Sequence, residues 1–241
     1  MAGGPVQTDV AKLARRLAGK FIVFDGPDGG GKSTQRQMLG TALTAAGLSV
    51  VHAKDPGGTA IGDRIRHVLL DYDLREMDVR CETLLFMASR AQLVGQVVEP
   101  ALAAGKVVLC DRFVSATCAY QGAQGYDTGR IIQVAPFAIG QCWPDATIVL
   151  DIDVDAGFTR TGRQPHHAGK NRKKHAGQHH MFDDVQPDAM EARPLEFHRK
   201  VRENFLKLHE VYPRPVTVVD ASGPPEAVQD RVMKALANVF A

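Results

Sequence analysis

The feature that most constrains this chain of 241 residues is a glycine-rich turn that directly follows a short apolar run. The run Lys20–Asp25 reads KFIVFD, and the turn Gly26–Ser33 reads GPDGGGKS, which satisfies the pattern GxxxxGK[ST]. Glycines in such a turn let successive backbone N–H groups point at phosphate oxygens, while the lysine reaches the terminal phosphates and the serine hydroxyl can ligate Mg²⁺. Because the turn lies between an expected strand and an expected helix, it predicts a binding site for a nucleoside triphosphate.

Short apolar runs alternate with helix-length segments along the rest of the chain. The expected strands are Lys20–Asp25, Ser49–Lys54, Lys106–Asp111, Ala146–Asp151 and Pro215–Asp220, and the expected helical segments include Gly31–Ala46, Val79–Ala104 and Pro187–Glu210. The apolar runs are continuous rather than alternating, which is typical of strands buried on both faces of a parallel sheet. The pattern predicts an α/β fold of the P-loop NTPase type, a doubly wound five-stranded parallel sheet flanked by helices, with its site along the carboxyl ends of the strands.

Composition and charge exclude several classes of protein. With 29 Lys and Arg against 27 acids, the net charge is only +2, which is not that of a DNA-coating protein. Residues 156–182 nevertheless contain no acid and carry six cations, and subtracting these from +2 leaves −4 for the rest of the chain. The six are Arg160, Arg163, Lys170, Arg172, Lys173 and Lys174. The small net charge of the whole chain therefore combines one cationic segment with an acidic remainder.

Nothing in the sequence indicates a membrane or secreted protein. There is no apolar run of about 20 residues that could span a bilayer, and the N-terminus has no apolar core or cleavage site of a secretory signal. Residues 1–19 are expected to form a flexible leader. The four cysteines, Cys81, Cys110, Cys118 and Cys142, show no CxxC spacing, which favours a reducing cytosol and a cytoplasmic protein.

Three further clusters fall at strand ends or on the helix that faces them. Lys54–Thr59 (KDPGGT) follows the second strand, and Arg66 comes one to two helical turns later. Phe86 and Arg90 are four residues apart, so a ring and a guanidinium share one helical face. Asp111 and Arg112 end the third strand and are followed by Thr117, Tyr120 and Gln121. A stacking ring, a base-edge donor, phosphate-binding arginines and groups for a sugar together predict a nucleoside monophosphate site opposite the glycine-rich turn.

Each of these residues also has a purely structural interpretation. A large apolar residue such as Phe86 usually packs into the core, and only its partner Arg90 favours a site. Asp111 and Arg112 could form a structural ion pair, although the carboxyl end of a strand favours a functional role. Arg66 could be a solvated helix residue, and Thr117 and Tyr120 could simply pack the following helix.

The ordered set of motifs resembles the thymidylate kinase family over nearly the whole chain. The matching segments are the glycine-rich turn, Lys54–Thr59, Leu85–Leu93 (LFMASRAQL), Asp111–Gly125 (DRFVSATCAYQGAQG) and Leu195–Phe205 (LEFHRKVRENF). The resemblance implies ATP-dependent phosphorylation of dTMP to dTDP with Mg²⁺, in nucleotide biosynthesis, by a homodimer joined through packed helices. It also implies one kinase domain over residues 20–241, with a lid insertion at about 160–182.

The resemblance further implies roles for the matching residues. Phe86 would stack on thymine, Arg90 would bind its edge with Thr117 and Gln121 nearby, and Tyr120 would pack against the sugar and favour deoxynucleotides. Arg66 and Arg112 would hold the acceptor phosphate, and Asp28 would lie near it and the 3′-hydroxyl. The residues expected to bind ATP are Gly26, Pro27, Asp28, Gly29, Gly30, Gly31, Lys32, Ser33 and Thr34. The substrate site is expected to include Asp55 and Pro56 as well, and Mg²⁺ is expected to bind Ser33 and Asp111. The residues expected to take part in catalysis are Lys32, Asp28, Arg112, Arg160 and Arg163.

Two departures from the family pattern stand out. Lys54 and Asp55 occupy positions where the family commonly has Arg and Glu, and lysine cannot replace a bidentate guanidinium on a phosphate. The insertion Gln164–His180 is longer than the short arginine-containing lid of the family. Since positions 27–30 of the glycine-rich turn contain no Arg or Lys, Arg160 or Arg163 of the lid is expected to supply the cation that stabilises the transition state.

The insertion also contains five of the nine histidines. They are His166, His167, His175, His179 and His180. With no cysteine and no helical i, i+4 pair among them, a solvated loop is favoured over a specific metal site. Two other functions remain open: a kinase for another nucleoside monophosphate or a deoxynucleoside, and a triphosphate-binding module whose basic segment docks nucleic acid. The lid position of that segment and its lack of interleaved aromatic residues argue against a nucleic-acid partner.

Overall fold

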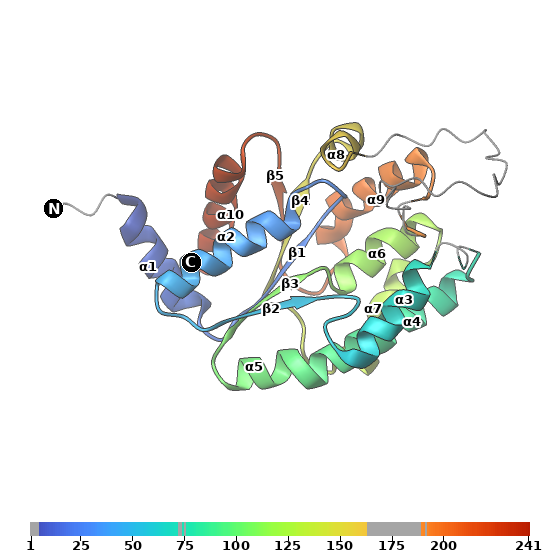
Figure 1. Cartoon of the computed structure of the whole chain (residues 1–241), viewed down its shortest axis with the longest axis horizontal. Helices are drawn as coiled ribbons and strands as arrows, with labels where there is room; N and C mark the ends of the chain where they lie inside the picture. Colours follow the sequence, from blue (N-terminus) through green and yellow to red (C-terminus); the bar gives the residue numbers. More distant parts are fainter. Residues whose placement is uncertain (1–4, 72–73, 75, 163–188, 191) are drawn as a thin grey trace, which may run out of the picture.

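A computed structural model describes residues 5–71, 74, 76–162, 189–190 and 192–241 (Figure 1). Its centre is a five-stranded sheet in the order β2-β3-β1-β4-β5, in which every pairing is parallel. The strands are β1 Phe21–Asp25, β2 Val50–Lys54, β3 Val107–Asp111, β4 Ala146–Asp151 and β5 Val216–Asp220. The predicted parallel sheet is confirmed, and each strand begins within one residue of its expected start.

Helices cover both faces of the sheet, so the doubly wound arrangement is also confirmed (Figure 1). One apolar core contains Phe21 and Val23 of β1, and a second core contains Ile22 and Phe24. Neighbouring residues of one strand thus point to opposite faces, which is why the apolar run is continuous. The helices are α1 Pro5–Leu17, α2 Lys32–Ala45, α3 Ala60–Leu70, α4 Val79–Leu93, α5 Glu99–Ala103, α6 Val114–Ala123, α7 Thr128–Ile139, α8 Val154–Arg160, α9 Leu195–Lys207 and α10 Pro225–Val239.

Two of the expected helical segments are subdivided. The segment Val79–Ala104 consists of α4, a π-helical turn over Val94–Val98, and α5, which has a proline in its first turn. In the segment Pro187–Glu210, α9 begins only after Pro194 and is extended by a 3-10 turn over Leu208–Glu210. Proline is favoured at a helix start and disfavoured in its interior, because it lacks the N–H group and its ring clashes with the preceding turn.

The prediction of a flexible leader over residues 1–19 is wrong for Pro5–Leu17, which form α1. Leu13, Ala14 and Leu17 of this helix are buried in the second core, together with Leu39 and other residues of α2 and α10. Their spacing of three and four residues places them on one helical face. The partners of that face lie in other elements of the fold, so the local pattern alone indicated a leader.

The helices on either side of the predicted lid are joined at its base. Arg202 of α9 holds Asp151, at the end of β4, with Nε 2.7 Å from Oδ1 and Nη2 3.0 Å from Oδ2. Arg199 of α9 lies 3.5 Å from Asp155 of α8. The basic insertion Gln164–His180, and Arg163 just before it, lie outside the described residues. Within the described ranges, no helix is both long and apolar enough to cross a membrane.

Candidate functional site

The glycine-rich turn forms the loop between β1 and α2, and Gly26–Gly31 are called the P-loop below. A Cβ atom at Gly26, where φ is 124°, would collide with the carbonyl oxygen of Leu150 in β4. At the other end of the loop, Gly31 caps α2 in the left-handed conformation without a side-chain hydrogen bond. Because glycine has no side chain, no N-cap side chain occupies the first N–H groups of α2. These N–H groups can therefore bind an anion at the helix N-terminus. Thr34 lies exposed in the first turn of α2.

Lys32 lies against the P-loop itself. Its Nζ donates to the carbonyl oxygens of Gly26, at 3.1 Å, and Pro27, at 2.8 Å, and lies 3.9 Å from Oδ1 of Asp28. Burial lowers the pKa of Lys32 to about 8, and the neighbouring Arg112 guanidinium acts in the same direction. The ammonium group is thus positioned on the loop that is expected to hold phosphates, in an environment that weakens its hold on the proton.

The two residues predicted to hold a metal ion lie together. The Oγ of Ser33 donates a hydrogen bond of 3.1 Å to Oδ2 of Asp111 at the end of β3. In the described part of the chain, no group of three or more His, Cys, Asp or Glu side chains gathers into a metal site. Mg²⁺ commonly takes only one or two protein oxygens and completes its shell with phosphate and water. The Ser33–Asp111 pair therefore fits Mg²⁺ delivered with a nucleotide.

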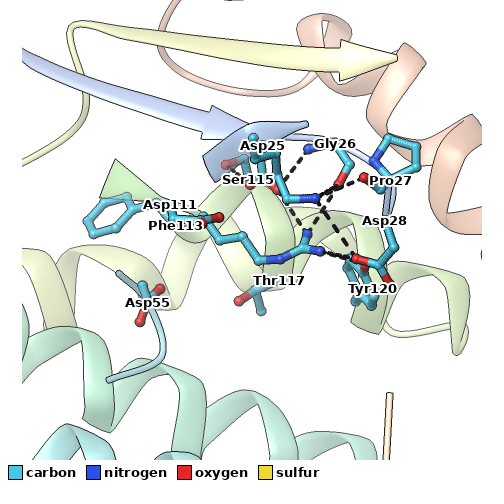
Figure 2. Close-up of polar contacts among 12 residues, drawn as sticks. Asp25, Gly26, Pro27, Asp28, Asp55, Asp111, Phe113, Ser115, Thr117 and Tyr120 are labelled. Carbon is cyan, nitrogen blue, oxygen red and sulfur yellow. Dashed lines mark hydrogen bonds and ion pairs between the residues drawn. The ribbon is translucent and has the colours of Figure 1, made fainter. Parts of the chain in front are cut away.

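Arg112 connects β3 to the P-loop rather than to its neighbour Asp111. It is the one described non-glycine residue with a positive φ, 66°, and its side chain reaches across to two other carboxylates. Nη1 lies 3.2 Å from Oδ1 of Asp25, and Nη2 lies 2.6 Å from Oδ1 of Asp28 and 3.0 Å from the hydroxyl of Tyr120. Figure 2 shows Asp25, Asp28 and Tyr120 close together beside the P-loop. The interpretation of Asp111 and Arg112 as a local ion pair does not match this geometry.

Asp25 and Ser115 belong to the same cluster but were not found by sequence reasoning. Asp25 is fully buried, and Oδ2 accepts a hydrogen bond of 2.6 Å from Oγ of Ser115. Burial raises the pKa of the Asp25 carboxyl, although Arg112 and the Ser115 hydrogen bond oppose the increase. The available signal was an aspartate that ends a buried strand immediately before the phosphate-binding turn.

The residues predicted to bind the acceptor surround one cavity of about 310 Å³. All nine predicted residues line it: Asp55, Pro56, Arg66, Phe86, Arg90, Arg112, Thr117, Tyr120 and Gln121. Asp28 and Lys32 of the phosphate-binding motif line the same cavity, as does Asp111. Sequence reasoning did not assign Leu70, Ala116 and Met190, which add apolar surface, or give a role to Lys54, whose side chain also lines the wall.

Arg90 is fixed on the wall of this cavity by other protein groups. It is only 1% exposed, and its Nε donates to Oδ2 of Asp55 at 2.7 Å. Its Nη2 donates to the Phe113 carbonyl oxygen, at 3.0 Å, and to Oγ1 of Thr117, at 3.1 Å. Burial raises the pKa of the Asp55 carboxyl, and the charge of Arg90 counteracts part of that effect. The Asp55–Arg90 pair therefore gives the guanidinium a defined orientation.

The aromatic and remaining basic residues are arranged around the same space. Phe86 is only partly buried and faces the cavity, which favours its interpretation as a site residue over a core residue. Tyr120 packs edge-on against Phe197 and Phe205 of α9, so its hydroxyl is held near Asp28 at 3.4 Å. Arg66 donates to the carbonyl oxygen of Pro56 at 3.0 Å. These contacts place apolar and cationic groups on one cavity.

Of the two lid arginines, the structure describes Arg160. Its Nη1 donates to the carbonyl oxygens of Ala221, at 3.0 Å, and Gly29, at 3.4 Å. Arg160 therefore bridges the end of α8, the P-loop and the turn after β5. Arg163 lies outside the described residues.

Comparisons with known proteins agree with this geometry. A family model described as thymidylate kinase matches residues 24–232. The chain is 40% identical over 225 residues to a thymidylate kinase of Pelotomaculum thermopropionicum, covering 93% of this chain and 95% of that protein. It is 38% identical over 219 residues to one of Exiguobacterium sibiricum, covering 90% and 94%. A crystal structure of thymidylate kinase from Ehrlichia chaffeensis superposes with a TM-score of 0.67 at 27% identity, covering 91% of this chain and 99% of that one.

Proposed function

The chain belongs to the thymidylate kinase family and is a nucleoside monophosphate kinase that phosphorylates dTMP, and we propose that it does so by transferring the γ-phosphoryl group of ATP. The observation that carries this proposal is that the nine acceptor residues and two residues of the phosphate-binding motif, Asp28 and Lys32, line one cavity. A donor phosphate on the P-loop would thus lie at the edge of the acceptor site. The products would be ADP and dTDP, and the biological role would be nucleotide biosynthesis.

The acceptor is proposed to lie with its base between Phe86 and the Arg90 wall, and with its phosphate toward Arg66 and Arg112. The partly buried ring of Phe86 gives a stacking surface, and Thr117 is hydrogen-bonded to Arg90. Tyr120, held by Phe197 and Phe205, is proposed to fill the space beside the sugar where a 2′-hydroxyl would lie. Asp55 acts through Arg90, and Pro56 holds Arg66 through its carbonyl oxygen.

The chemistry of phosphoryl transfer requires positioning and charge neutralisation more than covalent participation by the protein. The acceptor oxygen of a monophosphate is already anionic at neutral pH, so no general base is required. Lys32 and the N–H groups of the P-loop are proposed to hold the ATP phosphates, and Arg112 the acceptor phosphate. Because Arg112 also contacts Asp28, it links the acceptor cavity to the P-loop.

Mg²⁺ is the proposed cofactor, held by Ser33 and Asp111. The support is the hydrogen bond between Ser33 Oγ and Asp111 Oδ2, which brings two hard oxygen donors together at the N-terminus of α2. When bound, the ion would neutralise charge on the ATP phosphates. The two side chains would hold the ion beside the P-loop.

Residues 20–241 are proposed to form one kinase domain with a lid at about 160–182, and α1 packs onto this domain through Leu13, Ala14 and Leu17. The support is that both apolar cores include residues of β1, so the halves of the chain share one sheet. Arg160 or Arg163 is proposed to supply the cation that stabilises the transition state. Arg160 already contacts the P-loop carbonyl of Gly29.

We also propose a homodimer formed through packed helices. Leu84 of α4 is 60% exposed and Phe137 of α7 is 98% exposed, although both are large apolar residues. The two helices pack against one another (Figure 1). Sedimentation equilibrium tests this: a dimer that Phe137→Ser weakens is expected, and a monomer at all concentrations would contradict it.

The cytoplasm is the proposed location, and nucleic acid is not a proposed partner. The described cysteines are all free thiols, which suits a reducing compartment. The rival nucleic-acid function predicts retention of DNA or RNA at physiological salt, which an electrophoretic mobility shift would detect.

A coupled assay of ADP release tests the proposed function. ATP and Mg²⁺ are supplied with dTMP, dUMP, dCMP or dGMP in turn. We expect kcat/KM to be highest for dTMP. Turnover that is faster with another monophosphate, or absent with all four, would contradict the proposal.

A further inference from the structure

A buried carboxylate lies immediately behind the proposed base site. Glu82 of α4 is 2% exposed and is not part of the cavity wall. Its Oε2 accepts a hydrogen bond of 2.8 Å from Nε2 of Gln121 and another from Nε2 of Gln124. Its Oε1 lies 3.7 Å from Nη2 of Arg193, just before α9. A charged group with this little exposure is stable only when donors surround it, and here three side chains do so.

This carboxylate determines which way the Gln121 amide points. An ionised carboxylate only accepts hydrogen bonds, so the amide must turn its NH₂ group toward Glu82. The reverse orientation would place the amide oxygen against a carboxylate oxygen and remove the hydrogen bond between Gln121 and Glu82. Gln121 itself lines the cavity, and among the described residues no donor reaches its Oε1. Gln121 therefore presents a hydrogen-bond acceptor to the cavity.

The same cavity also presents donors. Arg90 carries only N–H groups, and its guanidinium is fixed beside the same cavity by Asp55 and Thr117. A pyrimidine with a 4-oxo group, thymine or uracil, carries an acceptor at O4 beside a donor at N3–H. Cytosine carries the reverse, a donor amino group beside the acceptor N3. The Arg90 donors and the Gln121 acceptor match the 4-oxo pattern and oppose the cytosine pattern.

We propose that Glu82 is a positioning residue for base selectivity, because it holds the Gln121 amide in the orientation that accepts a hydrogen bond from N3–H. The inference rests on the proposed function, since it requires a pyrimidine monophosphate in this cavity. Glu82 does not touch the substrate, so its influence passes through Gln121. Arg193 and Gln124, which do not line the cavity, also contact the carboxylate and help to hold it in place.

The test measures kcat/KM for dTMP and for dCMP in the wild-type protein and in Glu82→Gln. A glutamine at position 82 can either donate or accept, so the Gln121 amide can turn over. We expect the ratio of the two kcat/KM values to fall by about tenfold or more, mainly through KM. Glu99→Gln, the same change at an exposed residue of α5, is the matched control and should keep the wild-type ratio.

The double variant separates this positioning role from a merely structural one. In Gln121→Leu the amide is absent, so adding Glu82→Gln should change the selectivity ratio no further. A Glu82→Gln protein that loses activity equally toward both nucleotides, with a ratio within about twofold of wild type, overturns the inference. A further decrease in the double variant overturns it as well.

Gln121→Leu also gives an independent result if Glu82→Gln does not fold in a thermal unfolding assay. An unchanged ratio in Gln121→Leu overturns the inference, and a reduced ratio supports it. A wild-type protein that shows no preference for dTMP over dCMP contradicts both this inference and the proposed function. A preference that survives in both single variants contradicts the inference alone.

Discussion

The backbones of Gly29 in the P-loop and Gly157 in α8 pack directly against each other. A Cβ atom on Gly29 would collide with the carbonyl oxygen of Gly157, and one on Gly157 would collide with that of Asp28. Helix α8 therefore packs directly against the P-loop through two residues that have no side chain. Arg160, one turn further along α8, reaches the Gly29 carbonyl from this position.

This contact predicts the effect of Gly157→Ala. Alanine is favoured over glycine inside a helix, so α8 itself should remain folded. The added methyl group must instead push α8 away from the P-loop. We expect kcat to fall by about tenfold to a hundredfold and KM for ATP to rise, with little change in KM for dTMP. Gly95→Ala is the matched control, because a Cβ atom there has no neighbour within 4 Å. Wild-type kcat in Gly157→Ala would contradict this role for the contact.

The lid arginines can be separated by single substitutions. Removing the arginine that stabilises the transition state should lower kcat by at least about a hundredfold, with a much smaller change in dTMP affinity. The comparison uses Arg160→Ala, Arg163→Ala and, as a control for loss of an exposed cation, Arg214→Ala. If both lid variants turn over at the wild-type rate, the transition-state cation does not come from these residues.

The Ser33–Asp111 pair predicts a specific change in the Mg²⁺ requirement. Ser33→Ala removes one oxygen donor and should raise the Mg²⁺ concentration for half-maximal rate by about tenfold. Ser33→Thr keeps the hydroxyl and should need much less additional Mg²⁺. A titration of rate against Mg²⁺ at saturating ATP measures this. Identical titration curves for Ser33→Ala and the wild type would rule out Ser33 as a ligand.

The pKa of Lys32, lowered by burial to about 8, predicts a pH dependence for ATP capture. Below pH 8 the ammonium form dominates and can bind phosphates, and above pH 8 the neutral amine dominates. The value of kcat/KM for ATP, which reports ionisations of the free protein, should therefore fall as pH rises through about 8. Bound polyphosphate restores the charge, so kcat should depend less on pH. A kcat/KM value that stays level up to pH 10 would contradict this assignment.

The strands of the sheet could be predicted closely because each one contains a short apolar run in the local sequence. Strands such as β1 and β3 are buried on both faces, so their residues form uninterrupted apolar runs. The candidate site could be predicted for a related reason: the carboxyl ends of parallel strands meet at one edge, which brings Asp111 to Ser33 across 78 positions of sequence. Phe86 required the structure, since an aromatic residue on a long helix fits a core equally well.

The features that sequence reasoning missed depend on contacts between distant segments. Leu13 and Leu17 became a buried helical face only through their packing with α2 and α10. Glu82 resembles an ordinary solvated helix residue until Gln121, 39 positions later, is placed against it. Met190 joined the cavity because Ala189 N donates a hydrogen bond of 3.2 Å to the Leu70 carbonyl oxygen at the end of α3. None of these contacts has a short-range signature.

The most direct test of the central claim follows a labelled phosphate. ATP labelled at the γ-phosphate is incubated with dTMP, Mg²⁺ and either the wild-type protein or Lys32→Met, and the products are separated by chromatography. The account predicts that label appears in dTDP with the wild-type protein and is reduced by at least about a hundredfold with Lys32→Met. Label that appears only in inorganic phosphate, or that enters dTDP equally well with Lys32→Met, would contradict it.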